Sequence, residues 1–200
     1  KDGFDHFMLK EIYEQPAVIR DTMRGRLSLD KQATMLGGIA DYEQRILRAN
    51  KLTIIACGTS WHAGMVGKYL IEELAHIPVN VELASEFRYG SPVIGNQDVV
   101  LAISQSGETA DTLAALEMAK EKGALTLGLV NVVGSSIARI TDAGVYTHAG
   151  PEVSVASTKA FSTQVTGLTL MALRFAQQLG TLPRAQLQAL YEAYSEMPEL

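Results

Sequence analysis

A hydroxyl-rich segment, Ser104 to Thr109, is the part of this sequence whose residue types and spacing could best bind a ligand. It reads Ser-Gln-Ser-Gly-Glu-Thr and lies between an apolar run, 98–103, and a helix-forming stretch that begins at Ala110. A strand that turns directly into a helix brings free backbone N–H groups and the positive end of the helix dipole to one point. The hydroxyls add donors there, and Gly107 permits a tight turn. This chemistry suits a phosphate group.

A second hydroxyl-rich turn, Cys57-Gly-Thr-Ser60, follows an earlier apolar run, 52–57. In open parallel sheets, ligands bind beyond the carboxyl ends of the strands, where the strand order reverses. We therefore expect the two turns to face one crevice and to share one anion. The candidate binding residues are Thr59, Ser60, Ser104, Gln105, Ser106 and Thr109. The alternative is ordinary helix capping, since serine and threonine are common N-cap residues, but two such turns at neighbouring strands favour the anion site.

A third polar segment, Ser154-Val-Ala-Ser-Thr-Lys159, precedes a long helical pattern at 158–179. Ser157 or Thr158 could simply cap that helix. Because the segment follows the last strand, it could instead form a wall of the same pocket, and one residue can do both. The sequence leaves both interpretations open. Glu108 would repel a phosphate, so we expect its side chain to face outward at the start of its helix.

Other site chemistries have less support. The chain has no G-x-x-x-x-G-K-[ST] motif and no G-x-G-x-x-G after its first strand, so a dinucleotide site is not expected. One cysteine, Cys57, excludes an internal disulfide and a cysteine metal cluster, and it fits a reducing cytoplasm. The four histidines lack ligand spacing, so no metal is expected. A net charge of −5 argues against nucleic-acid and anionic-membrane partners, and the longest apolar stretch, 165–175, is too short to span a bilayer.

The elements that must position these loops form an α/β pattern. Five short, almost continuous apolar runs are typical of parallel strands covered on both faces: 52–57, 79–84, 98–103, 125–130 and 145–147. Helical stretches alternate with them, so we predict a three-layer, doubly wound, five-stranded parallel sheet with the flavodoxin-like order 2-1-3-4-5. Helices are predicted at 6–23, broken or kinked at Pro16, and at 29–47, 158–179 and 184–196. We expect a single domain over 1–200: a helical segment (1–50), the parallel core (51–148) and C-terminal helices (149–200).

Five stretches of the chain resemble the sugar isomerase (SIS) domain family. They are Phe7-Met-Leu-Lys-Glu-Ile-Tyr-Glu-Gln-Pro16, Ala56-Cys-Gly-Thr-Ser60, Ala84-Ser-Glu-Phe-Arg-Tyr89, Ser104-Gln-Ser-Gly-Glu-Thr-Ala-Asp-Thr112 and Val155-Ala-Ser-Thr-Lys-Ala-Phe161. The stretch at Ser104 alone indicates only an SIS domain. The first and last stretches are similar, more narrowly, to the first half of the isomerase part of the glutamine–fructose-6-phosphate aminotransferases, the glucosamine-6-phosphate synthase family.

The resemblance implies a division of roles within one sugar-phosphate site. Ser104, Gln105, Ser106 and Thr109 would hold the phosphate of a hexose 6-phosphate, with Ser60 beside them, and Val155 and Ser157 would contact the sugar. That family joins ammonia from a glutaminase domain to fructose 6-phosphate, and an enolisation-type proton transfer then gives glucosamine 6-phosphate without metal or organic cofactor.

The family's general base, its ring-opening histidine and its substrate-binding lysines lie in a second SIS half and a C-terminal tail, which match nothing in these 200 residues. We therefore expect no catalytic residue in this chain, and binding without turnover. The expected partners are the sugar phosphate, a glutaminase domain and a second SIS half in a longer parent chain, and a second copy in a homodimer.

Three alternatives remain. SIS domains also serve as sugar-phosphate sensors attached to DNA-binding or regulatory domains, although the N-terminal helices here carry no basic recognition face. Another SIS enzyme, such as a deglycase or a ketose–aldose isomerase, could share these loops, although the 10–16 stretch argues against it. A purely structural half that dimerises through apolar helix faces is the third.

Overall fold

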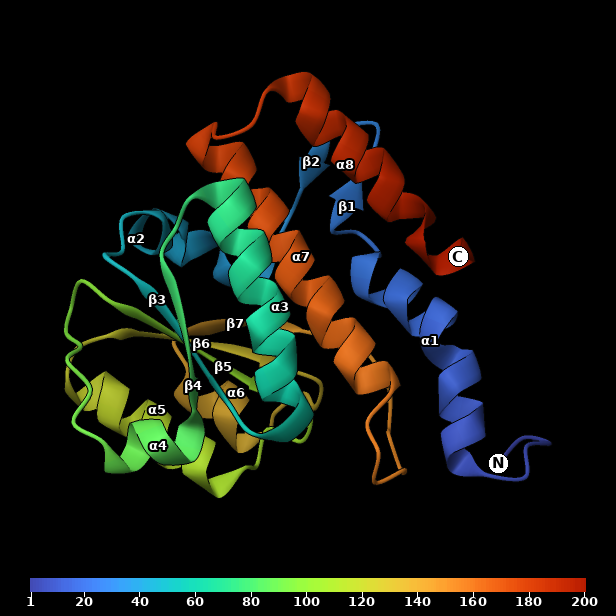
Figure 1. Cartoon of the computed structure of the whole chain (residues 1–200), viewed down its shortest axis with the longest axis horizontal. Helices are drawn as coiled ribbons and strands as arrows, with labels where there is room; N and C mark the ends of the chain where they lie inside the picture. The colour runs from blue at the N-terminus through green and yellow to red at the C-terminus, as the bar shows by residue number, and fades with distance from the viewer.

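The computed structural model describes residues 1–200, and a five-stranded sheet lies at its centre (Figure 1). The strands are β3 (Leu52–Ala56), β4 (Val79–Leu83), β5 (Val99–Ser104), β6 (Leu125–Val130) and β7 (Ala143–Tyr146). Their spatial order is β4-β3-β5-β6-β7 and every neighbouring pair is parallel, which confirms the predicted 2-1-3-4-5 order. All residues of β3, β5 and β6 are buried, as expected for strands covered on both faces.

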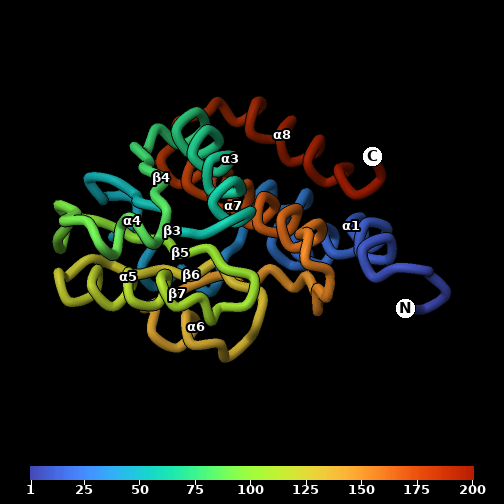
Figure 2. The backbone as a smooth tube through the Cα atoms, turned by 60° about the horizontal axis from the view of Figure 1, so that its bottom comes forward, coloured from blue at the N-terminus to red at the C-terminus, as the bar shows by residue number.

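Helices cover both faces of the sheet, so the fold has the predicted three layers (Figure 2). One face carries α3 (Gly58–Ala75) and α7 (Lys159–Leu179), and the larger apolar cluster lies beneath them. The other face carries α4 (Ala84–Tyr89), α5 (Ala110–Glu121) and α6 (Ser136–Ile140). Because side chains alternate along a strand, Ile54 packs in the first cluster and Ile55 in the second.

The first helix, α1 (Phe7–Met23), continues through Pro16, so of the two predicted outcomes, a break or a kink, the break is wrong. Proline has no N–H to donate to the carbonyl four residues earlier, which here is Ile12. The side chain of Gln15 supplies a substitute, because its Nε2 donates to the Ile12 carbonyl oxygen at 3.3 Å. Packing of α1 against α7 adds the tertiary support that a proline-containing helix needs.

The predicted helix at 29–47 is wrong over most of its length. The segment starts within a small antiparallel hairpin, β1 (Leu27–Ser28) and β2 (Ala33–Thr34), and continues as a 3-10 helix, η1 (Gly37–Tyr42), and a short α2 (Glu43–Leu47). Two adjacent glycines weaken any helix here. Gly38 also lies directly against β7, where an added Cβ would overlap the carbonyl oxygen of Gly144. The segment therefore covers one edge of the sheet, because β7 is an edge strand.

The C-terminal helices agree with the prediction. After α7 the chain turns at Gly180 and forms α8 (Arg184–Glu196), followed by the short 3-10 helix η2 (Met197–Glu199). In Figure 1, α8 and α1 lie on the outer side of α7, away from the sheet. No helix combines the length and the apolar character needed to cross a bilayer.

Candidate functional site

The two hydroxyl-rich turns leave the sheet side by side. β3 and β5 are adjacent and parallel, and their register pairs Ile55 with Ala102. The turn 57–60 therefore begins at the same level as Ser104, at the point where the strand order reverses. This juxtaposition is the one predicted from the sequence. It brings the N-termini of α3 and α5 together at the carboxyl edge of the sheet, where its parallel strands end.

Neither helix N-terminus at this point is closed by a side chain. The residue before α3 is Cys57, and the residue before α5 is Thr109; neither side chain caps its helix. The Thr109 hydroxyl instead lies 3.2 Å from the Ser104 hydroxyl. The first-turn N–H groups of both helices therefore lack intrahelical partners and can bind an anion.

The N-termini of α6 and α7, at the same carboxyl edge of the sheet, already bind carboxylates of the chain itself. Glu108 accepts the N–H of Ser136 at the start of α6 (2.8 Å), and hydrogen bonds from the Ser136 side chain and backbone lower the pKa of Glu108. Glu152 accepts the N–H groups of Thr158 (2.9 Å) and Ala160 (3.2 Å) at the start of α7. The chain thus supplies its own anions to α6 and α7, and leaves α3 and α5 open.

This arrangement settles two expectations. Glu108 is exposed and directed to α6, so it faces away from the candidate site as predicted. The interpretation that Ser157 or Thr158 caps α7 is wrong. Glu152 accepts the N–H groups at the start of α7 instead, and the Thr158 hydroxyl is buried without a partner. Sequence reasoning missed Glu152, whose position six residues before Thr158 fits no standard capping spacing.

Within the Ser104–Thr109 loop, the hydroxyls have different surroundings. Ser104 is buried and its Oγ accepts the N–H of Gly107 at 2.9 Å, so this hydroxyl holds the loop together. Gly107 has φ +68°, and an added Cβ would overlap Ser135, so the turn requires glycine. Gln105, Ser106 and Thr109 are half-buried and can reach a ligand, although Ser106 Oγ also accepts the N–H of Glu108 at 3.2 Å.

The turn 57–60 contributes one buried and one exposed hydroxyl. Ser60 is buried, and its Oγ accepts Nε2–H of Gln164 from α7 at 3.0 Å, which leaves the Ser60 hydroxyl hydrogen free to donate to another group. Thr59 is exposed and makes no side-chain hydrogen bond. The role of Gln164 was not predicted from the sequence. A buried amide within an otherwise apolar helix face is the signal that could have revealed it, since buried polar groups require partners.

The loop 150–158 lies on the other side of Gln105. A cavity of about 540 Å³ joins the two loops, and its lining comprises Gln105, Asn131, Val132, His148, Gly150, Pro151 and Glu152. Burial, followed by the nearby Arg26, lowers the pKa of His148. Ser157 is half-buried, whereas the Val155 side chain is fully exposed. The loop therefore borders the candidate site, but Val155 points into solvent and contacts none of the other candidate residues.

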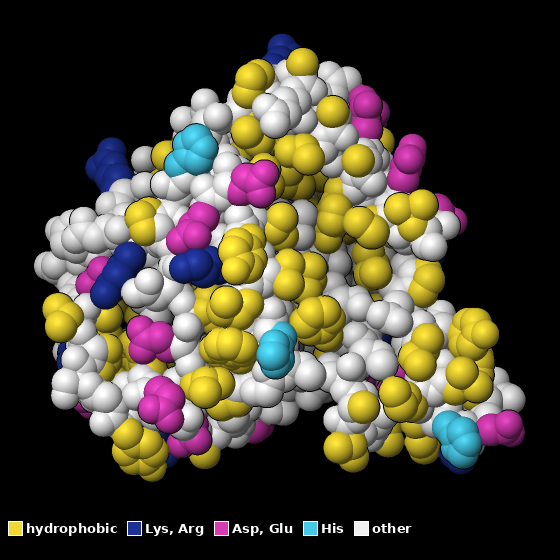
Figure 3. Space-filling model, in the orientation of Figure 1, with side chains coloured by type: hydrophobic (Ala, Val, Ile, Leu, Met, Phe, Trp, Pro, Cys, Tyr) yellow, Lys and Arg dark blue, Asp and Glu magenta, His cyan; other side chains and the backbone are white.

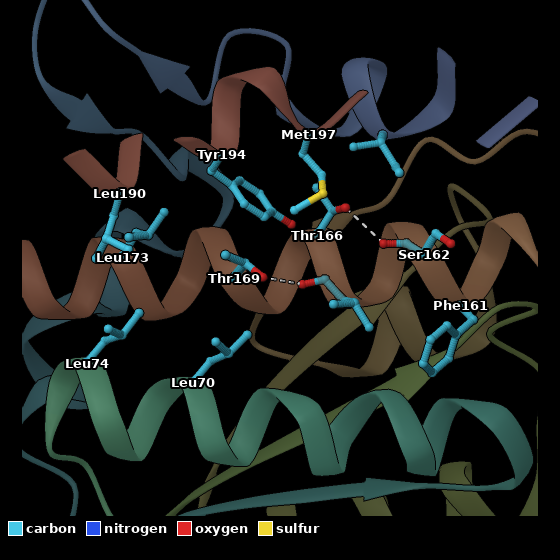
Figure 4. A pocket seen from close by; sticks show the side chains of 12 residues that line it. Leu70, Leu74, Phe161, Ser162, Thr166, Thr169, Leu173, Leu190, Tyr194 and Met197 are labelled. Atoms are coloured by element: carbon cyan, nitrogen blue, oxygen red, sulfur yellow. Dashed lines mark hydrogen bonds between the residues drawn. The ribbon is translucent and has the colours of Figure 1, made fainter. Parts of the chain in front are cut away.

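A second cavity, of about 420 Å³, has a different character. Apolar side chains gather between α3, α7, α1 and α8 (Figure 3), and those from α3, α7, α8 and η2 point into a common space (Figure 4). The hydroxyls of Thr166 and Thr169 donate to carbonyl oxygens of their own helix, both at 2.8 Å. No charged side chain lines this cavity and nine of its 12 lining residues are hydrophobic, which disfavours a phosphate there. No group of three or more His, Cys, Asp or Glu side chains is arranged to hold a metal ion.

Comparison with known proteins gives a consistent result. A family model described as "SIS domain" matches residues 45–174. Proteins named glutamine–fructose-6-phosphate aminotransferase (isomerizing) are similar to this chain, with 56% identity over 100% of it in Chlorobaculum tepidum and 54% identity over 99% of it in Bacteroides thetaiotaomicron. The chain spans about a third (32%) of the length of each of these relatives.

Solved structures are similar as well. The C-terminal domain of glucosamine-fructose-6-phosphate aminotransferase from Francisella tularensis superposes with a TM-score of 0.93 at 38% identity, covering 100% of this chain and 56% of that one. A phosphosugar isomerase structure from Silicibacter pomeroyi gives a TM-score of 0.73 at 28% identity, covering 94% of this chain and 55% of that one.

Proposed function

The chain belongs to the SIS domain family, and from that premise we propose that it binds a hexose 6-phosphate through the N-termini of α3 and α5. The observation that carries this proposal is the contrast among four helix N-termini at one edge of the sheet. Those of α6 and α7 are neutralised by Glu108 and Glu152, and those of α3 and α5 are open. A phosphate dianion is stabilised where free N–H groups and helix dipoles converge.

Each candidate side chain would either donate a hydrogen bond to the phosphate, hold the loop in place or line the space for the sugar. The hydroxyls of Ser60, Ser106 and Thr109 would donate to phosphate oxygens, supplementing the backbone N–H groups of the two helices. Ser104 would act indirectly, by fixing the loop through Gly107. Gln105 lines the cavity that extends to Gly150 and Glu152, so we place the sugar in that direction. Ser157 and Val155 of the loop 150–158 would contact the sugar, Ser157 from a half-buried position and Val155 from one that faces solvent.

We further propose that the chain is the first sugar-phosphate-binding half of a glutamine–fructose-6-phosphate aminotransferase and supplies binding rather than proton transfer. Relatives with that name are similar to this chain over 100% and 99% of its length. Of the two carboxylates at this edge, Glu152 already accepts N–H groups at the start of α7, and hydrogen bonds from Ser136 lower the pKa of Glu108, which weakens that carboxylate as a general base. The base would then come from another part of the parent protein. The cytoplasmic location and the homodimer remain predictions.

Ligand-dependent thermal unfolding tests the binding proposal. Fructose 6-phosphate and glucosamine 6-phosphate should raise the unfolding temperature, and unphosphorylated fructose should not. A ligand at about 100 times its dissociation constant stabilises the native state by about 2.7 kcal/mol. The double variant Ser106→Ala/Thr109→Ala should lose most of this effect, while the matched variant Ser28→Ala/Ser195→Ala, with both changes remote in sequence from the two loops, should keep it. Equal stabilisation of both variants would refute the assignment of the loop.

A further inference from the structure

Helix α1 binds the loop 150–158, although about 140 residues separate them in the sequence. Glu11 is buried, and its Oε1 accepts the N–H of Val153 at 2.6 Å and the N–H of Ser154 at 3.3 Å. Its other carboxylate oxygen accepts the hydroxyl of Ser154. One side chain of α1 therefore receives three donors from two consecutive residues of the loop.

A buried carboxylate persists only where donors replace the water it has lost. Burial by itself raises the pKa of Glu11, but the hydrogen bonds from Ser154 and Val153, together with nearby Lys159, outweigh it and hold that pKa below its ordinary value. Glu11 is therefore ionised at neutral pH and accepts all three hydrogen bonds. None of these donors has another acceptor among the hydrogen bonds of the loop.

The same face of α1 makes a second connection. Glu14, one turn after Glu11, pairs with the buried ammonium group of Lys159 at 2.7 Å, and Lys159 is the first residue of α7. Between the residues held by Glu11 (153 and 154) and those held by Glu152 (158 and 160) lie only Val155, Ala156 and Ser157. We call these three residues the tip. Both ends of the tip are fixed by carboxylates, and Val155 at its start is fully exposed.

The anchors of the tip are separate from the candidate phosphate site. Glu11 makes no hydrogen bond to the turn 57–60 or to the Ser104–Thr109 loop, whose own bonds are internal or run to α5, α6 and α7. A change at Glu11 therefore alters the position of the tip without altering the donors offered to a phosphate.

We propose that Glu11 is a positioning residue: it holds the tip of the loop 150–158 at the edge of the phosphate site and thereby sets affinity for the sugar part of the ligand. This inference rests on the proposed function above. Loss of the Glu11 charge releases the Val153 and Ser154 amides, the tip loses one of its two anchors, and contacts to the sugar weaken. Contacts to the phosphate stay as they are.

The test compares two ligands on the 200-residue chain and three variants of it. Dissociation constants for fructose 6-phosphate and for inorganic phosphate are measured with the wild type, Glu11→Gln, Ser154→Ala and the control Glu117→Gln, which removes an exposed carboxylate on α5. For Glu11→Gln the fructose 6-phosphate constant should rise about tenfold, equivalent to about 1.4 kcal/mol, and the phosphate constant by less than about twofold. Hydrogen exchange of the Val153 and Ser154 amides should accelerate in the same variant.

The outcomes separate the two proposals. If Glu11→Gln weakens both ligands equally, or leaves the two amides as protected as in the wild type, Glu11 has no positioning role and the inference is refuted. If the wild type binds neither ligand, the proposed function itself fails, and this inference fails with it. Ser154→Ala removes a single hydroxyl from a half-buried residue and should give the same selective loss on a smaller scale, so the comparison stands even if Glu11→Gln does not fold.

Discussion

The two loops that border the candidate site are held by opposite means. The Ser104–Thr109 loop is closed mainly by bonds between residues two to five positions apart, such as Gly107 N–H to Ser104 Oγ, with two further bonds to α6. The loop 150–158 is held mainly from elsewhere: Asn131 binds Ala149 and Gly150, and Glu11 binds Val153 and Ser154 across 142 and 143 residues. A local loop keeps its shape wherever its strand and helix form. A loop held from a distance keeps its shape only while the distant element stays docked.

The largest effect expected from this contrast is at Gly107. Alanine there meets both the left-handed backbone (φ +68°) and the side chain of Ser135, so Gly107→Ala should lower the free energy of unfolding by roughly 2–4 kcal/mol and abolish ligand binding. Gly134→Ala is the matched control, because Gly134 has φ +74° but open space around its Cβ position. It should cost only about 1 kcal/mol. Equal losses in urea denaturation would show that packing against Ser135 is unimportant.

A slightly smaller effect is expected at the ion pair that joins α1 to α7. Glu14→Gln leaves the ammonium of Lys159, 4% exposed, without its partner, and should cost about 2 kcal/mol. Lys159→Met leaves Glu14, which is 31% exposed and remains hydrated, so this variant should be clearly less destabilised. Chemical denaturation of both variants measures the asymmetry. The reverse order would mean that Lys159 does not depend on Glu14 for its neutralisation.

The attachment of the loop 150–158 should also depend on pH. The folded state lowers the pKa of Glu11 from its ordinary value of 4.5, so the carboxylate stabilises the fold fully above that value and loses its contribution as the pH falls through the folded pKa. The difference in unfolding free energy between wild type and Glu11→Gln should therefore shrink below about pH 4.5. A difference that stays constant down to pH 3 would contradict the role of the charge.

The smallest effect is expected at the tip itself. Val155 is fully exposed, so Val155→Ala should change the unfolding free energy by less than about 0.5 kcal/mol. Thermal unfolding without ligand measures this directly. A larger loss would mean that the tip packs against another part of the molecule in solution, and that the anchors at its two ends are not what holds it.

The same contrast explains what could be predicted from the sequence. The buried strands, their order and the juxtaposition of the two hydroxyl-rich turns all follow from local patterns: continuous apolar runs, helix formers and a glycine within a polar turn. The 3-10 helix η1 was missed because Gly38 serves a contact with β7 that no local pattern reveals.

The residues that hold the site were harder to predict than the residues that form it. Glu152, Gln164 and Glu11 all act through hydrogen bonds to partners at unusual or very long separations, six to 143 residues away. Glu11 and Glu14 lie within the stretch that marked the family resemblance, and their role became visible only when α1 was placed against α7.

The approach of Gly38 to Gly144 has a consequence for how copies of this chain behave toward each other. A strand at the edge of a sheet offers a row of unpaired N–H and C=O groups to any second strand that can reach it. Here η1 lies so close to β7 that no side chain fits between their backbones, and access to that edge is blocked by the chain's own N-terminal segment. The absence of a side chain at Gly38 thus permits a contact that hinders strand-to-strand association at this edge.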